Sequence, residues 1–65
     1  MCAVTERAKM QIEGVRRQMD EMRVNFIKAA QIKKDEGENP EPFYLAEEAL
    51  ARADNDLWLA EVALI

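Results

Sequence analysis

The stretch KKDEGENPEP, residues 33–42, is the only break in a 65-residue sequence that otherwise suits helices. Gly37 is the residue type found just past a helix end, where the backbone turns left-handed. Asn39 can cap a following helix, and Pro40 suits the first position of that helix because the N–H that proline lacks has no partner there. The stretch therefore predicts a turn at 37–39 between two helices.

Apolar residues on both sides of this turn recur at spacings of three and four, the pattern of helices that pack along their length. With Thr5 as its N-cap, the first helix is predicted over about 5–36 and the second over about 40–64. The first stripe is Ala8, Ile12, Val15, Met19, Met22, Phe26 and Ala29. The second is Phe43, Ala46, Leu50, Ala53, Leu57, Ala60 and Leu64. A turn this short makes the helices antiparallel, so the sequence predicts one all-α domain, 1–65, folded as a helical hairpin of two long heptad-patterned helices.

The predicted register centres the turn between Asn39 and Pro40, so that Phe26 lies opposite Ala53 and about thirteen residues of the first helix overhang the second. Charged positions flank both stripes: Lys9, Arg16 and Arg23 on the first helix, and Glu47, Asp54 and Glu61 on the second. In this register Arg23 would lie near Asp54 and Arg16 near Glu61. Such pairs account for the uneven charge, since residues 1–36 hold eight Lys and Arg against six acids, and 37–65 hold one against seven.

A chain of 65 residues needs reinforcement, because a single core below roughly 70–80 residues contributes little stability. Cys2 is the only cysteine and there is no histidine, which excludes an internal disulfide and argues against zinc. We therefore expect self-association into a four-helix bundle or a higher helical oligomer. The residues predicted to form the interface are Val4, Ala8, Met10, Ile12, Tyr44, Trp58, Leu59, Val62 and Ile65. They either complete a homodimer core or bind a different protein, and Trp58 is the best single anchor in both cases.

No catalytic, cofactor or metal motif is present, so we expect neither an enzyme nor a bound cofactor. The carboxylates of Asp54, Asp56 and Glu61 lack the calcium-binding loop pattern and are interpreted as a solvated, salt-bridged face. Cys2 has no neighbouring base and is interpreted as a spectator thiol. The predicted function is a non-enzymatic protein–protein interaction module, a small oligomeric regulator or inhibitor that acts by binding a partner protein.

Three alternatives stay open: a structural subunit of a larger assembly, a binding module for a small ligand or nucleotide, and an RNA-binding hairpin. Arg7, Arg17 or Tyr44 would hold the ligand between protomers. The predicted architecture and length are similar to those of the RNA-binding Rop hairpins, with no shared motif, but a pI near 4.7 argues against nucleic acid. The sequence has neither an 18-residue apolar run nor a signal-peptide pattern, and the acidic second helix disfavours membrane binding, so we expect a cytoplasmic protein.

Overall fold

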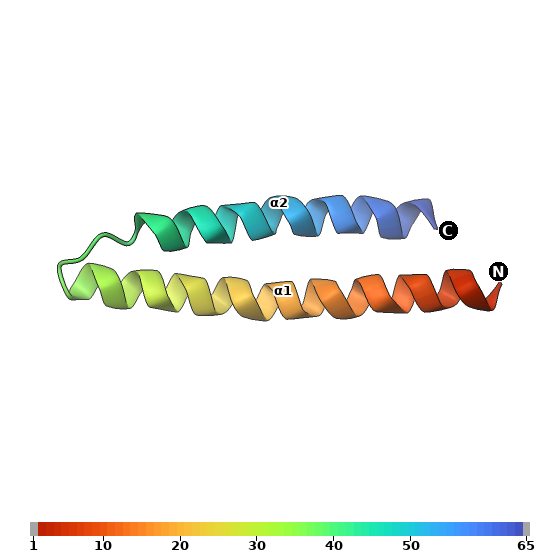
Figure 1. Cartoon of the computed structure of the whole chain (residues 1–65), viewed down its shortest axis with the longest axis horizontal. Helices are drawn as coiled ribbons and strands as arrows, with labels where there is room; N and C mark the ends of the chain where they lie inside the picture. Colours follow the sequence, from red (N-terminus) through yellow and green to blue (C-terminus); the bar gives the residue numbers. More distant parts are fainter. Residues whose placement is uncertain (1, 65) are drawn as a thin grey trace.

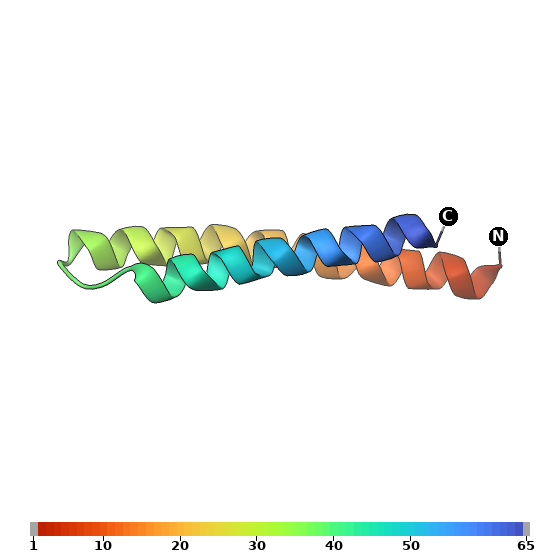
Figure 2. The same ribbon diagram turned by 90° about the horizontal axis from the view of Figure 1, so that it is seen from above.

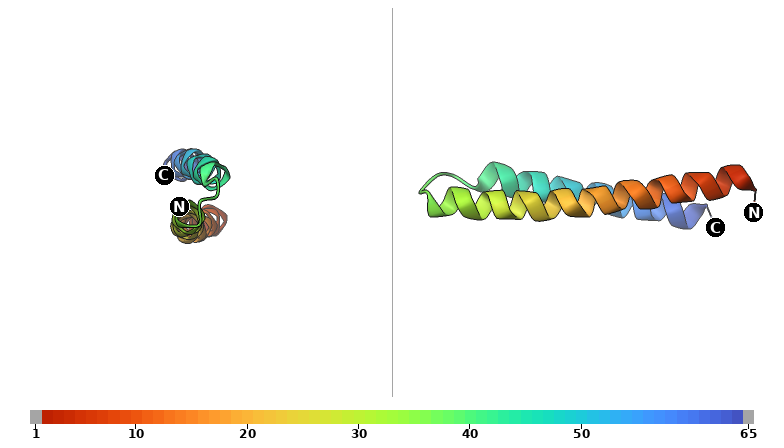
Figure 3. Two further views of the ribbon diagram at one scale, coloured as in Figure 1. Left: turned by 90° about the vertical axis from the view of Figure 1, so that its left-hand side faces the viewer. Right: turned by 90° about the horizontal axis from the view of Figure 1, so that it is seen from below.

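The computed structural model describes residues 2–64, which form two antiparallel helices, α1 (Ala3–Asp35) and α2 (Glu41–Ala63) (Figure 1). No strand occurs among these residues, and the two helices pack against each other, so the predicted all-α hairpin is confirmed. Viewed from its end, the hairpin is a single pair of helices (Figure 3). Its principal extents are 53 × 14 × 10 Å, and its radius of gyration is 15.4 Å. A compact domain of this length would have a radius of gyration of about 11 Å, so the molecule is a thin rod.

The end of α1 has the hydrogen-bond arrangement expected of a glycine-terminated helix. Gly37 has φ +76°, and its N–H donates to the Lys34 carbonyl at 3.1 Å, while the Glu38 N–H donates to the Lys33 carbonyl at 2.8 Å. These bonds satisfy carbonyl groups that the helix itself leaves without partners. The predicted role of Gly37 as the helix-ending residue is confirmed.

The start of α2 uses the predicted residues Asn39 and Pro40, but the helix begins one residue later than predicted. The Asn39 side-chain oxygen Oδ1 accepts a hydrogen bond from the Glu41 N–H at 3.1 Å, and the Pro40 carbonyl accepts one from the Phe43 N–H at 3.0 Å. Asn39 therefore satisfies a donor of the first turn. The helix begins at Glu41, with Pro42 in its first turn.

The start of α1 differs from the prediction, because Thr5 is not its N-cap. The helix begins at Ala3, and the Glu6 N–H donates to the carbonyl of Cys2, whose backbone is extended. Thr5 lies inside the first turn, with Oγ1 3.1 Å from Cys2 Sγ. Alanine is the best helix former, so the helix continues back through Ala3 although no side chain caps it.

The two helices also lie in a different register from the predicted one. The linker runs back along α1 before α2 begins, so the end of α2 reaches the first turns of α1 (Figure 1). The Phe26 ring contacts Phe43, with ring centroids 6.3 Å apart, although Ala53 was its predicted neighbour. The predicted overhang of about thirteen residues is therefore wrong. Along the rod, α2 crosses α1 at a shallow angle (Figure 2).

Two columns of buried and half-buried side chains fill the seam between the helices. The apolar column consists of Ile12, Met19, Phe26, Phe43, Leu50, Leu57 and Leu64. The ionic column consists of Arg16, Arg23, Glu47, Asp54 and Glu61. Val15 and Met22, predicted to lie in the seam, are instead 45% and 44% exposed because the arginines take the inward positions. Within residues 2–64, only Met19 and Ala30 are buried hydrophobic residues.

The two glycines provide a test of this turn, because alanine should have opposite effects at the two positions. Gly37→Ala should lower the free energy of unfolding by about 1 kcal/mol, since an L side chain is strained at this φ. Gly14→Ala should raise it by up to about 1 kcal/mol, since Gly14 lies inside α1 with open space around its Cβ position. Urea unfolding at one fixed chain concentration measures both. Equal effects at the two positions would contradict the assignment of Gly37.

Candidate interaction surfaces

The ionic column joins the two helices through hydrogen-bonded ion pairs. Arg16 donates from Nε to Asp54 Oδ1 at 2.9 Å and from Nη1 to Glu61 Oε2 at 3.2 Å. Arg23 donates from Nε and Nη2 to Glu47 Oε1 at 3.0 and 2.7 Å. The predicted Arg16–Glu61 pair is confirmed. The predicted Arg23–Asp54 pair is replaced by Arg23–Glu47, because the register places Glu47 beside Arg23.

These hydrogen bonds stabilise the charged form of both arginines. The bond to Asp54 raises the pKa of Arg16, and the bond to Glu47 raises the pKa of Arg23. The acceptors are only 16–20% exposed, so the bonds form in a partly desolvated seam, where charge-assisted hydrogen bonds are strong. Glu61 Oε1 is buried without a hydrogen-bond partner among the described residues.

The candidate reactive groups of the sequence are the carboxylates of the seam and the Cys2 thiol. Asp54 and Glu61, considered above as possible metal ligands, are both bound to Arg16. Residues 2–64 contain no group of three His, Cys, Asp or Glu side chains that could hold a metal ion. The hydrogen bond with Thr5 lowers the pKa of the exposed Cys2 thiol. The structure places no histidine beside this thiol, since the chain has none.

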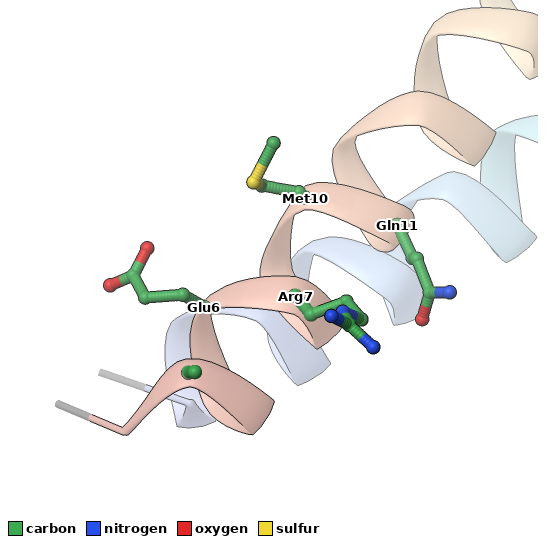
Figure 4. A pocket seen from close by; sticks show the side chains of 5 residues that line it. Glu6, Arg7, Met10 and Gln11 are labelled. Carbon is green, nitrogen blue, oxygen red and sulfur yellow. The ribbon is translucent and has the colours of Figure 1, made fainter.

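A hollow on the surface of α1 is lined by Ala3, Glu6, Arg7, Met10 and Gln11. Glu6 and Met10 point to one side of the helix, whereas Arg7 and Gln11 point to the other (Figure 4). All the lining residues come from one helix, so the hollow is shallow and its polar groups do not converge. Within one hairpin Arg7, Arg17 and Tyr44 lie apart: the two arginines are ten residues apart, about 15 Å along α1, and Tyr44 lies on α2 near the turn. The ligand site predicted between protomers stays a prediction.

The seam has two flanking sides, and these sides differ in chemistry. Residues seven apart lie on the same side of a helix, because seven residues make almost two turns. The side next to the apolar column, which we call the uncharged face, carries Ala8, Val15, Met22, Ala29, Ala46, Ala53 and Ala60. The next row outward consists of Val4, Gln11, Gln18, Asn25, Ile32, Pro42, Ala49, Asp56 and Ala63. Asp56 is the only charge in these two rows, so this side is a broad, almost uncharged surface of small, apolar and amide side chains.

The side next to the ionic column, the aromatic face, combines apolar anchors with acidic groups. Its apolar residues are Ile27, Tyr44, Ala51 and Trp58, with Met10, Val24 and Val62 along the outer edge. Its charged residues are Glu6, Glu13, Arg17, Asp20, Lys34, Glu41 and Glu48. Five acids against two bases make this face negative, and Trp58 is exposed on it toward the C-terminal end of α2.

The predicted interface residues are divided among several surfaces. Tyr44 and Trp58 lie on the aromatic face, and Met10 and Val62 lie at its edge. Ala8 lies on the uncharged face, Val4 lies beside it, and Leu59 lies on the outer side of α2. Ile12 belongs to the apolar column, where α2 packs on it, because α2 extends further along α1 than predicted (Figure 1). Ile65 lies outside the described residues.

Sequence reasoning missed the exposure of Val15 and Met22, which it assigned to the seam between the helices. Their spacing is compatible with either position, since they lie one step around the helix from Arg16 and Arg23. The available signal was that Arg16 and Arg23 match Asp54 and Glu47 in both charge and spacing. Two such pairs can occupy the seam and turn the neighbouring apolar residues outward.

No helix within residues 2–64 combines the length and the apolar character that crossing a membrane requires. No protein family, curated protein or solved structure matches this chain. Its function is therefore inferred from the two faces and the seam.

Neighbouring arginines test the importance of the ionic column. Arg16→Ala should lower the urea midpoint of unfolding, because it leaves Asp54 and Glu61 close together without their shared cation. Arg17→Ala should change the midpoint much less, since Arg17 is exposed and makes no ion pair among the described residues. Unfolding followed by circular dichroism compares the two variants. Equal midpoints would show that the ionic column contributes nothing to stability.

Proposed function

We propose that this chain is a non-enzymatic protein-interaction module, a small regulator or inhibitor that self-associates through its helices and acts by covering part of a partner protein. One observation carries the proposal: twelve large hydrophobic side chains are 37–78% exposed, whereas two hydrophobic residues are buried. Apolar surface on this scale in a small domain is typical of a binding surface. A chain of this length also needs additional burial to be stable.

The solvent-accessible surface supports self-association. The hairpin exposes 4877 Å², whereas a compact monomer of 7.5 kDa is expected to expose about 4,250 Å². The excess arises because a single pair of helices can shield only one side of each helix. Packing a second pair against the first would remove this excess, and heptad-spaced stripes on both helices are typical of four-helix bundles.

The aromatic face supports binding of a different protein. Exposed Tyr and Trp side chains are enriched at the energetic centres of interfaces, and Trp58 and Tyr44 both lie on this face. The surrounding acids, such as Glu13 and Glu48, favour a partner with an apolar patch bordered by basic residues. A module of this kind would inhibit or regulate its partner by occupying that patch.

The other functions considered have less support. An RNA-binding surface needs free basic residues, but Arg16 and Arg23 are engaged by acids of α2. A ligand held between protomers by Arg7, Arg17 or Tyr44 has no enclosed cavity within residues 2–64 to support it, since the hollow beside Arg7 is lined by one helix alone. The protein-interaction module is therefore the proposal that accounts for most of the exposed apolar surface.

Affinity purification of the tagged protein from its native host tests the proposal, with two variants that each make the chain more negative by one charge. Trp58→Asp should abolish capture of the partner, because it removes the anchor of the aromatic face. Arg52→Gln, on the outer side of α2, should leave capture intact. Circular dichroism verifies that both variants are helical. Retained capture by Trp58→Asp would exclude the aromatic face as the binding site.

A further inference from the structure

We infer that a second copy of this chain packs on the uncharged face, giving a four-helix bundle whose two aromatic faces remain outside. The inference rests on the proposed self-association and specifies which face it uses. Four observations support it: the direction of the apolar stripes, the distribution of charge, the size of the face and the sizes of its side chains.

The apolar stripes of the two helices do not point at each other. The α1 stripe, centred on Ile12, Val15, Met19 and Met22, is displaced by one heptad position from the residues that face α2. Heptad positions are about 51° apart around a helix. In a square arrangement of four helices, the direction to the bundle axis lies about 45° from the direction to a neighbouring helix. The stripe of α1 therefore points toward the axis of a four-helix bundle.

The same displacement occurs in α2, on the same side of the hairpin. Its stripe combines Leu50 and Leu57 from the apolar column with Ala53 and Ala60 from the uncharged face. Because both helices are displaced toward one side, both stripes converge on a single line outside the hairpin. A second hairpin with the same displacement would supply the other two helices around this line.

Charge identifies the second copy as the occupant. Each chain carries a net charge of −4, so two copies meet with the least added repulsion where the facing residues are uncharged. A two-fold axis brings the same patch of both copies together. The aromatic face carries five acids against two bases, so two such faces would repel on balance. The seven residues of the uncharged face carry no charge.

The area of the face is sufficient for a stable dimer. The part of α1 that α2 accompanies is about 35 Å long, and two adjacent helices are about 20 Å wide. The uncharged face and the row next to it together cover roughly 700 Å², close to the roughly 800 Å² that each partner buries in a standard interface.

The side chains on this face differ in size between the two helices. On α1 the central residues are Val15 and Met22, and on α2 they are Ala46, Ala53 and Ala60. Placing α1 of one copy over α2 of the other brings large residues against small ones, as close packing requires. Val15 and Met22 would then be buried together with the half-exposed side of the apolar column.

Methionine oxidation of the wild-type chain tests this arrangement without any substitution. In the hairpin alone, Met22 is 44% exposed and Met10 is 67% exposed, so peroxide should oxidise both at similar rates. In the bundle, Met22 is covered, whereas Met10 stays exposed at the edge of the aromatic face. We expect oxidation of Met22 to be at least about ten-fold slower than that of Met10 where the chain is dimeric, and this protection to disappear on dilution.

A pair of charge substitutions on α1 provides a second test by sedimentation. Met22→Glu should weaken the dimer by about 100-fold or more, because it places one carboxylate per copy in an apolar interface. Ile27→Glu is the matched control, since Ile27 is also about half exposed on α1 but lies on the aromatic face. It should leave the dimer intact. If Met22→Glu does not fold, the oxidation measurement decides.

The outcomes separate this inference from the proposed function. A dimer in which Met22 is protected supports both. A dimer in which Met22 is oxidised as fast as Met10, or which Ile27→Glu dissociates, overturns the assignment to the uncharged face but leaves self-association standing. A folded monomer at all accessible concentrations overturns both self-association and the inference.

Discussion

The ionic column is the interaction on which the rest of the structure depends. Arg16 and Arg23 reach across the seam to Asp54, Glu61 and Glu47, and thereby fix which sides of the two helices meet. A seam between two helices has room for about two columns of side chains. Once charged groups occupy one column, a single apolar column is left to form the core. The exposure of Val15 and Met22 and the small number of buried residues both follow from this.

Ion pairs of this kind select an arrangement more than they stabilise it. Partly exposed pairs contribute little net free energy, because desolvation and side-chain ordering offset much of the attraction. Their directional hydrogen bonds nevertheless discriminate between registers, since a shift of one turn would separate Arg23 from Glu47. Apolar contacts such as Phe26 with Phe43 then supply the burial that the selected register allows. The hairpin therefore has a defined register but few buried apolar side chains.

The two helix ends beside the turn, which are determined by a few neighbouring residues, were predictable from the sequence. Gly37 ends α1 and Asn39 supports the start of α2 for reasons contained in a few neighbouring residues. The register and the inward faces were not predictable in this way. Two stripes with the same spacing, one apolar and one charged, lie a single heptad position apart, and spacing alone does not decide which of them faces the other helix. The path of the linker, which runs back along α1, depends on the tertiary fold as well. The exposure of Tyr44 and Trp58 was expected from the sequence. The exposure of Val15 and Met22 was not, because it depends on which stripe faces the other helix.

The division into two faces suggests how so small a chain could combine self-association with partner binding. If the uncharged faces of two copies meet, the ionic columns lie toward the flanks of the bundle and the aromatic faces point in opposite directions. Each dimer would then present Trp58 and Tyr44 twice, on surfaces that do not compete with the dimer contact. Two equal sites on one rigid rod raise the effective affinity for a partner that is itself oligomeric or repetitive, because the second contact forms within the complex. The charged seam would make this possible, since it leaves one apolar side of the hairpin uncovered and separates that side from the acidic, aromatic one.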